Sequence, residues 1–345
     1  MELAFVIEKF LLVIIIFVIT LVIAMYSTLA ERKVAGFMQD RPGPERAGPF
    51  GLLQPLADGG KFFFKEEIIP AGAHKTLFIL GPTLAIITAC ISSAVIPWGQ
   101  DLTIGGRVIE LQVADINVGV LYIFGVIALG VYGIMLGGWA SNNKFSLMGA
   151  IRAGSQSISY EIPMGLSIIA LLMVTQTLSM KEIVVQQSGF LSWNIWVQPI
   201  GFLIFLICAF AETNRVPFDL PECETELVGG YHTEYSSMKL GLFMFSEYIN
   251  MFVSSALMAA LYFGGYNFPF MDSLGLSANW ITIIGVIVFF IKIFAFIFFF
   301  MWIRWTLPRF RYDQLMNLGW KILIPLSIAN IVITGIVIIL KDTVF

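Results

Sequence analysis

Six carboxylates crowd one short stretch of this 345-residue chain. The segment AETNRVPFDLPECETELVGGYHTEY, residues 211–235, has one arginine, Arg215, and the acids Glu212, Asp219, Glu222, Glu224, Glu226 and Glu234. Two carboxylates about 6 Å apart at an effective dielectric of about 20 repel by roughly 3 kcal/mol, or about two pKa units. The set is therefore either a coupled proton reservoir that titrates near neutral pH or a solvated acidic loop. Charge alone favours the solvated loop, because exposed runs of like charge are common.

Two further carboxylates stand inside apolar stretches. Glu247, in LGLFMFSEYINMF, is expected about two turns into a membrane helix, where an ionised carboxylate costs about 2.5–3.5 kcal/mol. It is a functional candidate or a hydrogen-bonded interior acid. Glu161, in SISYEIPMG, is expected in the first turn of a helix just ahead of Pro163, where the helix dipole favours a carboxylate anyway.

The elements that must hold these acids are membrane helices. Apolar residues make up 58% of the chain, against about 45–50% in soluble domains. A span takes about 20 residues. The predicted fold is all-α and polytopic, a single integral-membrane domain over residues 1–345, with about eight spans near 5–29, 76–97, 117–140, 162–178, 195–212, 240–264, 279–303 and 321–340. The first span is predicted to be retained, because it lacks the basic start and the cleavage pattern of a signal peptide.

The orientation follows from the Lys and Arg count, since cytoplasmic loops carry the excess. Fifteen bases fall in the predicted loops 30–75, 141–160, 213–239 and 304–320, and four fall on the opposite side. Both termini are therefore expected on the outer side. Lys292 lies within the seventh span.

The first loop carries a predicted amphipathic helix. Phe50, Leu53, Ala57 and Phe64 recur at helical spacing, while Asp58 falls on another face. This helix either lies in the membrane interface or packs on the bundle as a surface helix. Glu31 and Arg32, just before the loop, are expected to end the first span as a stop signal with snorkelling side chains.

A metal site is not indicated by the sequence. The three cysteines are far apart and His74 and His232 do not complete a site with them, so no zinc or iron–sulfur centre is expected. Any redox cofactor must then belong to a partner or diffuse in.

Four long segments resemble one family. AERKVAGFMQDRPGPERAGPFGLLQPLADGGKFFFKE, SQSISYEIPMGLS, AETNRVPFDLPECETELVGGYHTEYS and PRFRYDQLMNLGWK are similar to the signature segments of the quinone-site membrane subunit of respiratory complex I, the H subunit of the bacterial NADH:quinone oxidoreductase. The similarity runs in order over nearly the whole chain. The outward loops 98–116 and 264–280 carry little specific signal and are expected to meet lipid or accessory partners.

The resemblance implies a component of a proton-translocating enzyme in the bacterial inner membrane. Its substrate is a quinone, ubiquinone or menaquinone, while FMN and iron–sulfur clusters belong to partner subunits. Expected partners are peripheral-arm iron–sulfur and quinone-site subunits, antiporter-like and small membrane subunits and lipid, with no nucleic acid. By position, the residues that resemble the family's chamber-lining set are Glu31, Arg32, Arg41, Asp58, Phe218 and Arg304. Those that resemble its acidic proton chain are Glu161, Glu212, Glu222, Glu224, Glu226, Glu234 and Glu247.

Two other classes are considered. A standalone ion transporter also carries intramembrane acids, yet no inverted repeat with Gly- or Pro-broken helices is evident. A membrane anchor of a nickel–iron hydrogenase-type complex shares the bundle without needing quinone. The Gly- and Pro-rich first loop with its charges favours the quinone-site family.

Overall fold

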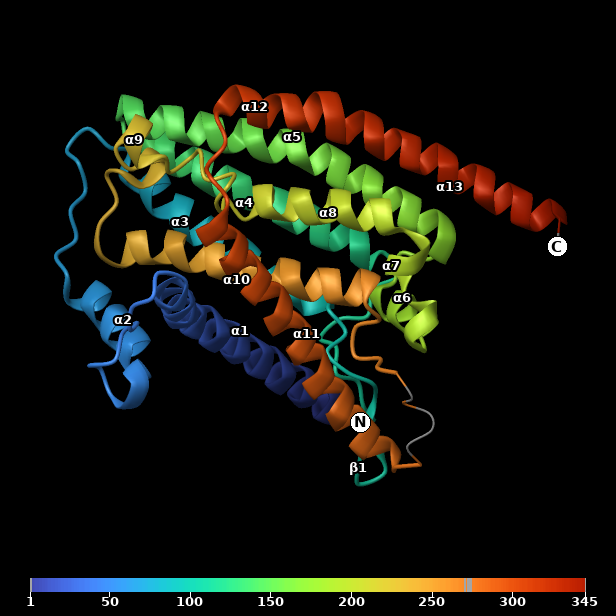
Figure 1. Ribbon diagram of the computed structural model, residues 1–345. Coiled ribbons are helices and arrows are strands. Elements are labelled where there is room, and N and C mark those ends of the chain that lie inside the picture. Colours follow the sequence, from blue (N-terminus) through green and yellow to red (C-terminus); the bar gives the residue numbers. More distant parts are fainter. Residues whose placement is uncertain (1, 270, 272–274, 345) are drawn as a thin grey trace.

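The fold is a helical bundle with a small β-hairpin at one end (Figure 1). The computed structural model describes residues 2–269, 271 and 275–344. Met1 and Phe345, on which the prediction of outward termini falls, lie outside the described residues, as do positions 270 and 272–274 of the loop 264–280.

Thirteen α-helices are present in the described part of the chain. They are α1 (Glu2–Met38), α2 (Gln54–Phe64), α3 (Lys75–Ile91), α4 (Gly119–Ala140), α5 (Lys144–Thr175), α6 (Met180–Gln186), α7 (Asn194–Val197), α8 (Pro199–Glu212), α9 (Glu224–Leu227), α10 (Ser237–Tyr262), α11 (Ala278–Thr306), α12 (Tyr312–Asn317) and α13 (Ile324–Val344). Short 3₁₀ turns are η1 (Pro49–Gly51), η2 (Ser92–Val95), η3 (Phe190–Ser192) and η4 (Gly230–His232), and a π-helical turn, η6 (Leu318–Leu323), joins α12 to α13.

Seven of the described helical segments are long and apolar enough to cross a membrane. The eighth predicted span, 195–212, is broken at Gln198 into α7 and the 14-residue apolar α8. The break falls just before Pro199, which begins α8 because its missing N–H is not needed in a first turn. The prediction of an all-helical polytopic membrane protein is confirmed.

Helix α10 forms the centre of the bundle and packs against α1, α3 and α11. Every residue from Met251 to Tyr262 is buried, as expected for a helix that is apolar on all sides. Helices α3 and α4 approach closely through glycine, since a Cβ on Gly81 would lie 2.8 Å from Gly137 Cα and 2.9 Å from Gly133 O. Small residues allow such contacts between membrane helices.

Two predicted loop regions are helical instead. Helix α1 continues to Met38, so Glu31 and Arg32 lie within it and do not end it. Helix α5 begins at Lys144, so the predicted loop 141–160 is mostly helix and Glu161 lies in the middle of α5, not in its first turn. The predicted loop 304–320 likewise contains α12 and the start of η6.

The physical reason at α5 is that its first half is polar but buried. Asn143 caps it by accepting a hydrogen bond from Phe145 N at 2.9 Å. Gln156 donates to Ala211 O at 2.8 Å, and a Cβ on Gly149 would lie 2.5 Å from Tyr231 N. Polar and small residues here fill contacts with neighbouring segments, which a hydropathy pattern does not detect.

The first loop contains the predicted amphipathic helix as α2, which lies apart from the bundle axis in Figure 1. Phe62 faces α10 across Gly241, while Phe63 and Phe64 are 70% and 93% exposed in this chain. The helix therefore packs on the bundle through one side and presents a second apolar side outward.

The hairpin in the outward loop 98–116 was not predicted. Strands β1 (Leu102–Ile104) and β2 (Arg107–Ile109) pair antiparallel, with Thr103 opposite Val108. Two glycines, Gly105 and Gly106, form the turn with positive φ.

The charge inside the seventh span is fully hydrogen-bonded. Lys292 Nζ donates to the carbonyls of Phe263, Gly265 and Asn267 at 2.6–2.8 Å, and it lies over the Trp193 ring. An ammonium has three donors, so these carbonyls satisfy it and hold α11 to the chain after α10.

Candidate functional site

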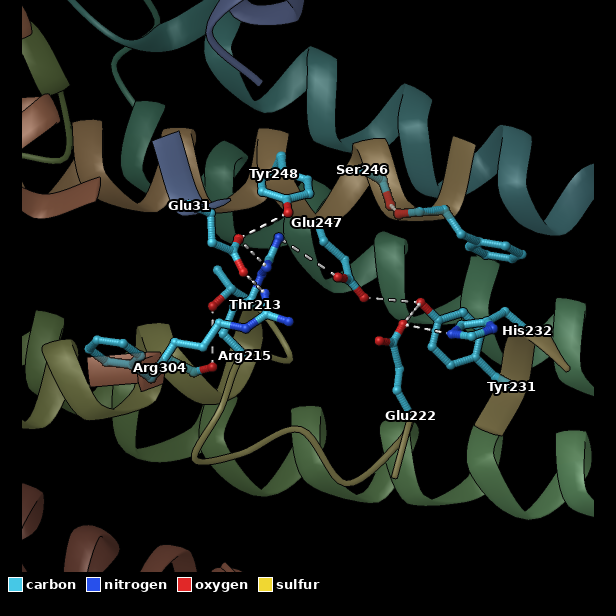
Figure 2. Close-up of polar contacts among 12 residues, drawn as sticks. Glu31, Thr213, Arg215, Glu222, Tyr231, His232, Ser246, Glu247, Tyr248 and Arg304 are labelled. Carbon is cyan, nitrogen blue, oxygen red and sulfur yellow. Dashed lines mark hydrogen bonds and ion pairs between the residues drawn. The ribbon is translucent and has the colours of Figure 1, made fainter. Parts of the chain in front are cut away.

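A row of ionisable side chains connects α1 to the loop that follows α8 (Figure 2). Arg215, in that loop, stands between two carboxylates from different helices. Its Nη1 lies 3.1 Å from Glu31 Oε2 and its Nη2 lies 4.0 Å from Glu247 Oε2. The guanidinium also lies over the ring of Tyr248, 4.1 Å from the centroid. Burial acts to lower the pKa of Arg215, but Tyr248, Glu31 and Glu247 raise it, so the group stays charged.

Glu31 is the most connected carboxylate of the row. Besides Arg215, its Oε1 lies 2.5 Å from Arg304 Nη1, and its Oε2 accepts a hydrogen bond from Tyr248 at 2.9 Å. These contacts join α1, the loop after α8, α10 and the end of α11 at one carboxylate.

The other half of the row is Glu247, Tyr231 and Glu222. The Tyr231 hydroxyl lies 3.0 Å from Glu222 Oε1 and 3.1 Å from Glu247 Oε1. A hydroxyl donates only one hydrogen bond, so the second contact requires a proton on one of the two carboxyl groups. The arrangement is therefore suited to passing a proton between the two acids through Tyr231.

His232 contacts the far end of the row. Its Nε2 lies 3.3 Å from Glu222 Oε1. Burial acts to raise the pKa of Glu222, but the hydrogen bond and charge of His232 outweigh burial and lower it. The same contact raises the pKa of His232 against the effect of its own burial.

One glycine brings the two arms of the loop together. Gly230 has φ +62°, and a Cβ there would lie 1.8 Å from the carbonyl oxygen of Pro221. Only a residue without a side chain fits this approach. The contact sets Glu222, next to Pro221, beside Tyr231 and His232, next to Gly230.

Asp219 lies beside the row with its own partner. Burial and the nearby Glu222 raise the pKa of Asp219 to about 6, although Arg309 Nη2 lies 2.8 Å from its Oδ2. The predicted drift of this acidic stretch toward neutral pH is thus found at Asp219, whereas the pKa of Glu222 moves the opposite way because of His232.

The structure does not gather all the predicted acids. Glu224 and Glu226 are exposed on α9, and Glu226 Oε2 lies 2.5 Å from Arg152 Nη1. Glu234 Oε1 accepts a hydrogen bond from Asn143 at 2.5 Å. The expected crowding of Glu222 with Glu226 is absent from the described contacts, because Glu222 turns toward His232 and Tyr231.

Glu161 and Glu212 form a second pair deeper in the bundle. Glu161 on α5 is the charged neighbour that acts on Glu212 at the end of α8. The Oε2 of Glu212 is buried and has no hydrogen-bond partner among the described residues. A buried carboxyl oxygen without a partner is costly to ionise.

A cavity of about 450 Å³ opens beside the row. Glu31, Arg215, Glu222 and Glu247 line it together with most of the predicted chamber residues, namely Arg32, Arg41, Asp58 and Arg304. At its mouth, Arg32 Nη1 lies 2.7 Å from Asp58 Oδ2, which joins α1 to α2. Phe218 is outside this lining, because it is buried between Tyr160 and Phe310.

An apolar groove continues from the cavity. It measures about 460 Å³ and shares Pro55, Gly59, Phe62, Gly241 and Phe245 with the cavity. Its other walls come from α1 and α2 and are almost entirely hydrocarbon, including Leu21, Val22 and Leu56. The two spaces together form one path from a charged interior to an apolar surface.

Arg215, Tyr231, His232 and Tyr248 were not assigned a role from the sequence. Tyr248 directly follows Glu247, and Tyr231 and His232 stand in the acidic segment, so adjacency to a candidate acid is the signal that points to them. No group of three or more His, Cys, Asp or Glu side chains that could hold a metal is found over residues 2–269, 271 and 275–344.

Comparison with known proteins places this membrane bundle among the components of a respiratory enzyme. The family model described as NADH dehydrogenase matches residues 10–335. The chain is 69% identical to the first NADH-quinone oxidoreductase H subunit of Cytophaga hutchinsonii, over 97% of this chain and 98% of that protein. It is 62% identical to the NADH-quinone oxidoreductase H subunit of Flavobacterium johnsoniae, over 99% and 98% of the two chains, and 50% identical to the H subunit of Leptospira biflexa, over 90% and 89%.

The chain belongs to the family of NADH-quinone oxidoreductase H subunits, which are membrane subunits of complex I. It is thus a multi-pass membrane protein and one part of a multi-subunit enzyme. The resemblance found in the sequence is confirmed, and the standalone transporter and the hydrogenase-type anchor are set aside.

Proposed function

We propose that this chain forms the membrane side of the chamber in which quinone is reduced, and that its buried carboxylates couple this chamber to proton translocation. The observation that carries the proposal is the path from cavity to groove. Its inner end is lined by Glu31, Arg215, Glu222 and Glu247, and its outer end by hydrocarbon.

A quinone has the chemistry to match this path. The ring carries two carbonyl oxygens that accept hydrogen bonds, and Arg32 and Arg304 supply donors at the cavity wall. The isoprenoid tail of ubiquinone or menaquinone is apolar and suits the groove beside α1 and α2.

The row supplies the acid chemistry. Reduction of a quinone to a quinol takes two electrons and two protons, and a site closed to water needs titratable groups that hand protons on. Glu222, Tyr231 and Glu247 form such a relay within hydrogen-bond distance. Glu161 and Glu212 extend it into the bundle, while Glu224, Glu226 and Glu234 remain predicted members of the acidic chain.

Electrons have to arrive from partners in this proposal. FMN and iron–sulfur clusters are assigned to peripheral-arm subunits, because the cysteines of this chain lack the spacing of a cluster site. Antiporter-like and small membrane subunits would adjoin the acidic chain. The end that carries α2 and α9 is assigned to the cytoplasm of a bacterial inner membrane, with both termini outside, on the count of basic residues.

The test is a quinone that carries a photoreactive group on its ring. In the assembled enzyme, illumination should label peptides of α1, α2 or α10 of this chain, and excess unlabelled quinone should prevent the labelling. Labelling confined to partner subunits would contradict the proposal.

A further inference from the structure

We propose that His232 is the group that takes protons from water and passes them into the row at Glu222. The inference rests on the proposed function, because it names the point at which protons enter the relay. His232 lies at the end of the row, beyond Glu222 and Tyr231 (Figure 2).

Exposure falls from this end of the row to the other. The side chains of Glu222 and His232 are 21% and 18% exposed, Glu247 is 12% exposed, and Glu31 and Arg215 are 8% and 5% exposed. Glu222 and Glu247 line the cavity, whereas His232 is outside the lining that the structure describes. The exposed part of His232 therefore opens to a different surface from the cavity, and Glu222 stands between that surface and the proposed quinone site.

The proton step is a simple transfer between existing contacts. A neutral imidazole with its proton on Nε2 takes a proton from water at Nδ1 and becomes an imidazolium. It then gives the Nε2 proton to Glu222 Oε1, 3.3 Å away, which leaves a neutral imidazole and a carboxylic acid. Glu222 next donates to the Tyr231 oxygen while the Tyr231 hydroxyl proton moves to Glu247, once Glu247 has passed its own proton on.

The charges around the ring favour this role. Glu222 and Asp219 both raise the pKa of His232, and Tyr231 lies edge-on to it. The helices packed against this turn are α4 and α5; α4 has no charged residue, and on α5 Arg152 is paired with Glu226. An imidazole with a pKa raised from about 6.5 is well placed to carry protons near neutral pH.

The chain offers a matched control, because it has two histidines, His74 and His232. His74 caps α3, accepting from Leu77 N at 3.5 Å, and is remote from the row in its contacts. In the assembled enzyme, His232→Gln should slow NADH:quinone reductase activity at least about tenfold and remove the fall in rate that the wild type shows as pH rises through the pKa of His232. His74→Gln should leave rate and pH profile unchanged.

Added imidazole separates proton delivery from a structural role. It should restore the rate of His232→Gln in proportion to its concentration and have no such effect on the wild type or on His74→Gln. A wild-type rate and pH profile in His232→Gln, or a slow variant that imidazole does not rescue, would overturn the inference. If Glu222→Gln slows quinone reduction while His232→Gln does not, only the entry point is wrong; if neither slows it, the proposed relay fails as well.

Discussion

At the scale of residues, Arg215 decides whether two buried carboxylates can stay ionised together. It is flanked by Glu31 and Glu247, and its side chain is almost fully buried. Removing one partner of a buried ion pair costs about 3–5 kcal/mol, because the remaining charge has lost both water and its counter-ion. Arg215 is thus expected to matter more to stability than any surface arginine of the chain.

Arg215→Met should therefore lower the thermal midpoint of the purified complex markedly, followed by circular dichroism or by subunit loss on native gels. Arg311→Met is the control. Arg311 is exposed and pairs only with Asp313 at 3.3 Å, and surface pairs contribute about 0–1 kcal/mol. Equal thermal midpoints for the two variants would show that the Arg215 contacts do not stabilise the site.

At the scale of elements, the loop after α8 depends on one glycine. Gly230→Ala places a methyl group against Pro221 O and forces a residue with a side chain to a positive φ. The matched control is Gly105→Ala in the hairpin turn, which has φ +59° and nothing within 4 Å of the added Cβ. The conformational cost, about 1–2 kcal/mol, is common to both, so only the clash differs.

We expect Gly230→Ala to lose most of the quinone reductase activity of the assembled enzyme, because Glu222 no longer meets Tyr231 and His232. Gly105→Ala should keep that activity. The measurement is NADH:quinone reductase activity per assembled complex. Normal activity in Gly230→Ala would mean that the loop geometry at Pro221 is not required.

The groove between α1, α2 and α10 makes a second prediction at this scale. Val22 lines the groove and Val18, one turn earlier on α1, does not, although both are similarly exposed at 43% and 49%. Val22→Trp should raise the KM for quinones with several isoprene units and leave the KM for a quinone with a short tail nearly unchanged. Val18→Trp should change neither. An equal effect on both quinones would place the tail elsewhere.

The sequence predicted the elements better than their contacts. Hydropathy located the apolar spans, and the α2 helix followed from its amphipathic spacing. It missed the first half of α5, where Gln156 and Gly149 are polar or small yet buried, and it ended α1 at Glu31 because an acid–base pair resembles a stop signal. Residue types alone also did not show that Glu222 meets His232 and not Glu226, since that depends on the path of the loop through Gly230.

At the scale of the whole molecule, the row and the hairpin lie at different parts of the bundle (Figure 1). Single cysteines at Val228 and Val108, both more than half exposed, can report the sidedness once Cys90, Cys208 and Cys223 are replaced. The excess of basic residues predicts that Val228→Cys reacts with an impermeant thiol reagent only from the cytoplasm, and Val108→Cys only from outside. The reverse pattern would invert the proposed topology.

The buried carboxylates of the bundle are proposed to serve the quinone cavity. The most direct measurement compares two activities of assembled enzyme with Glu222→Gln or Glu247→Gln: NADH:quinone reduction, and NADH:ferricyanide reduction, which takes electrons before they reach the chamber. Glu66→Gln, at an exposed carboxylate of the first loop, is the control. We predict that the two row variants lose quinone reduction by about 10²-fold while ferricyanide reduction stays normal, and that Glu66→Gln keeps both activities. Wild-type quinone reduction in both row variants would contradict the claim.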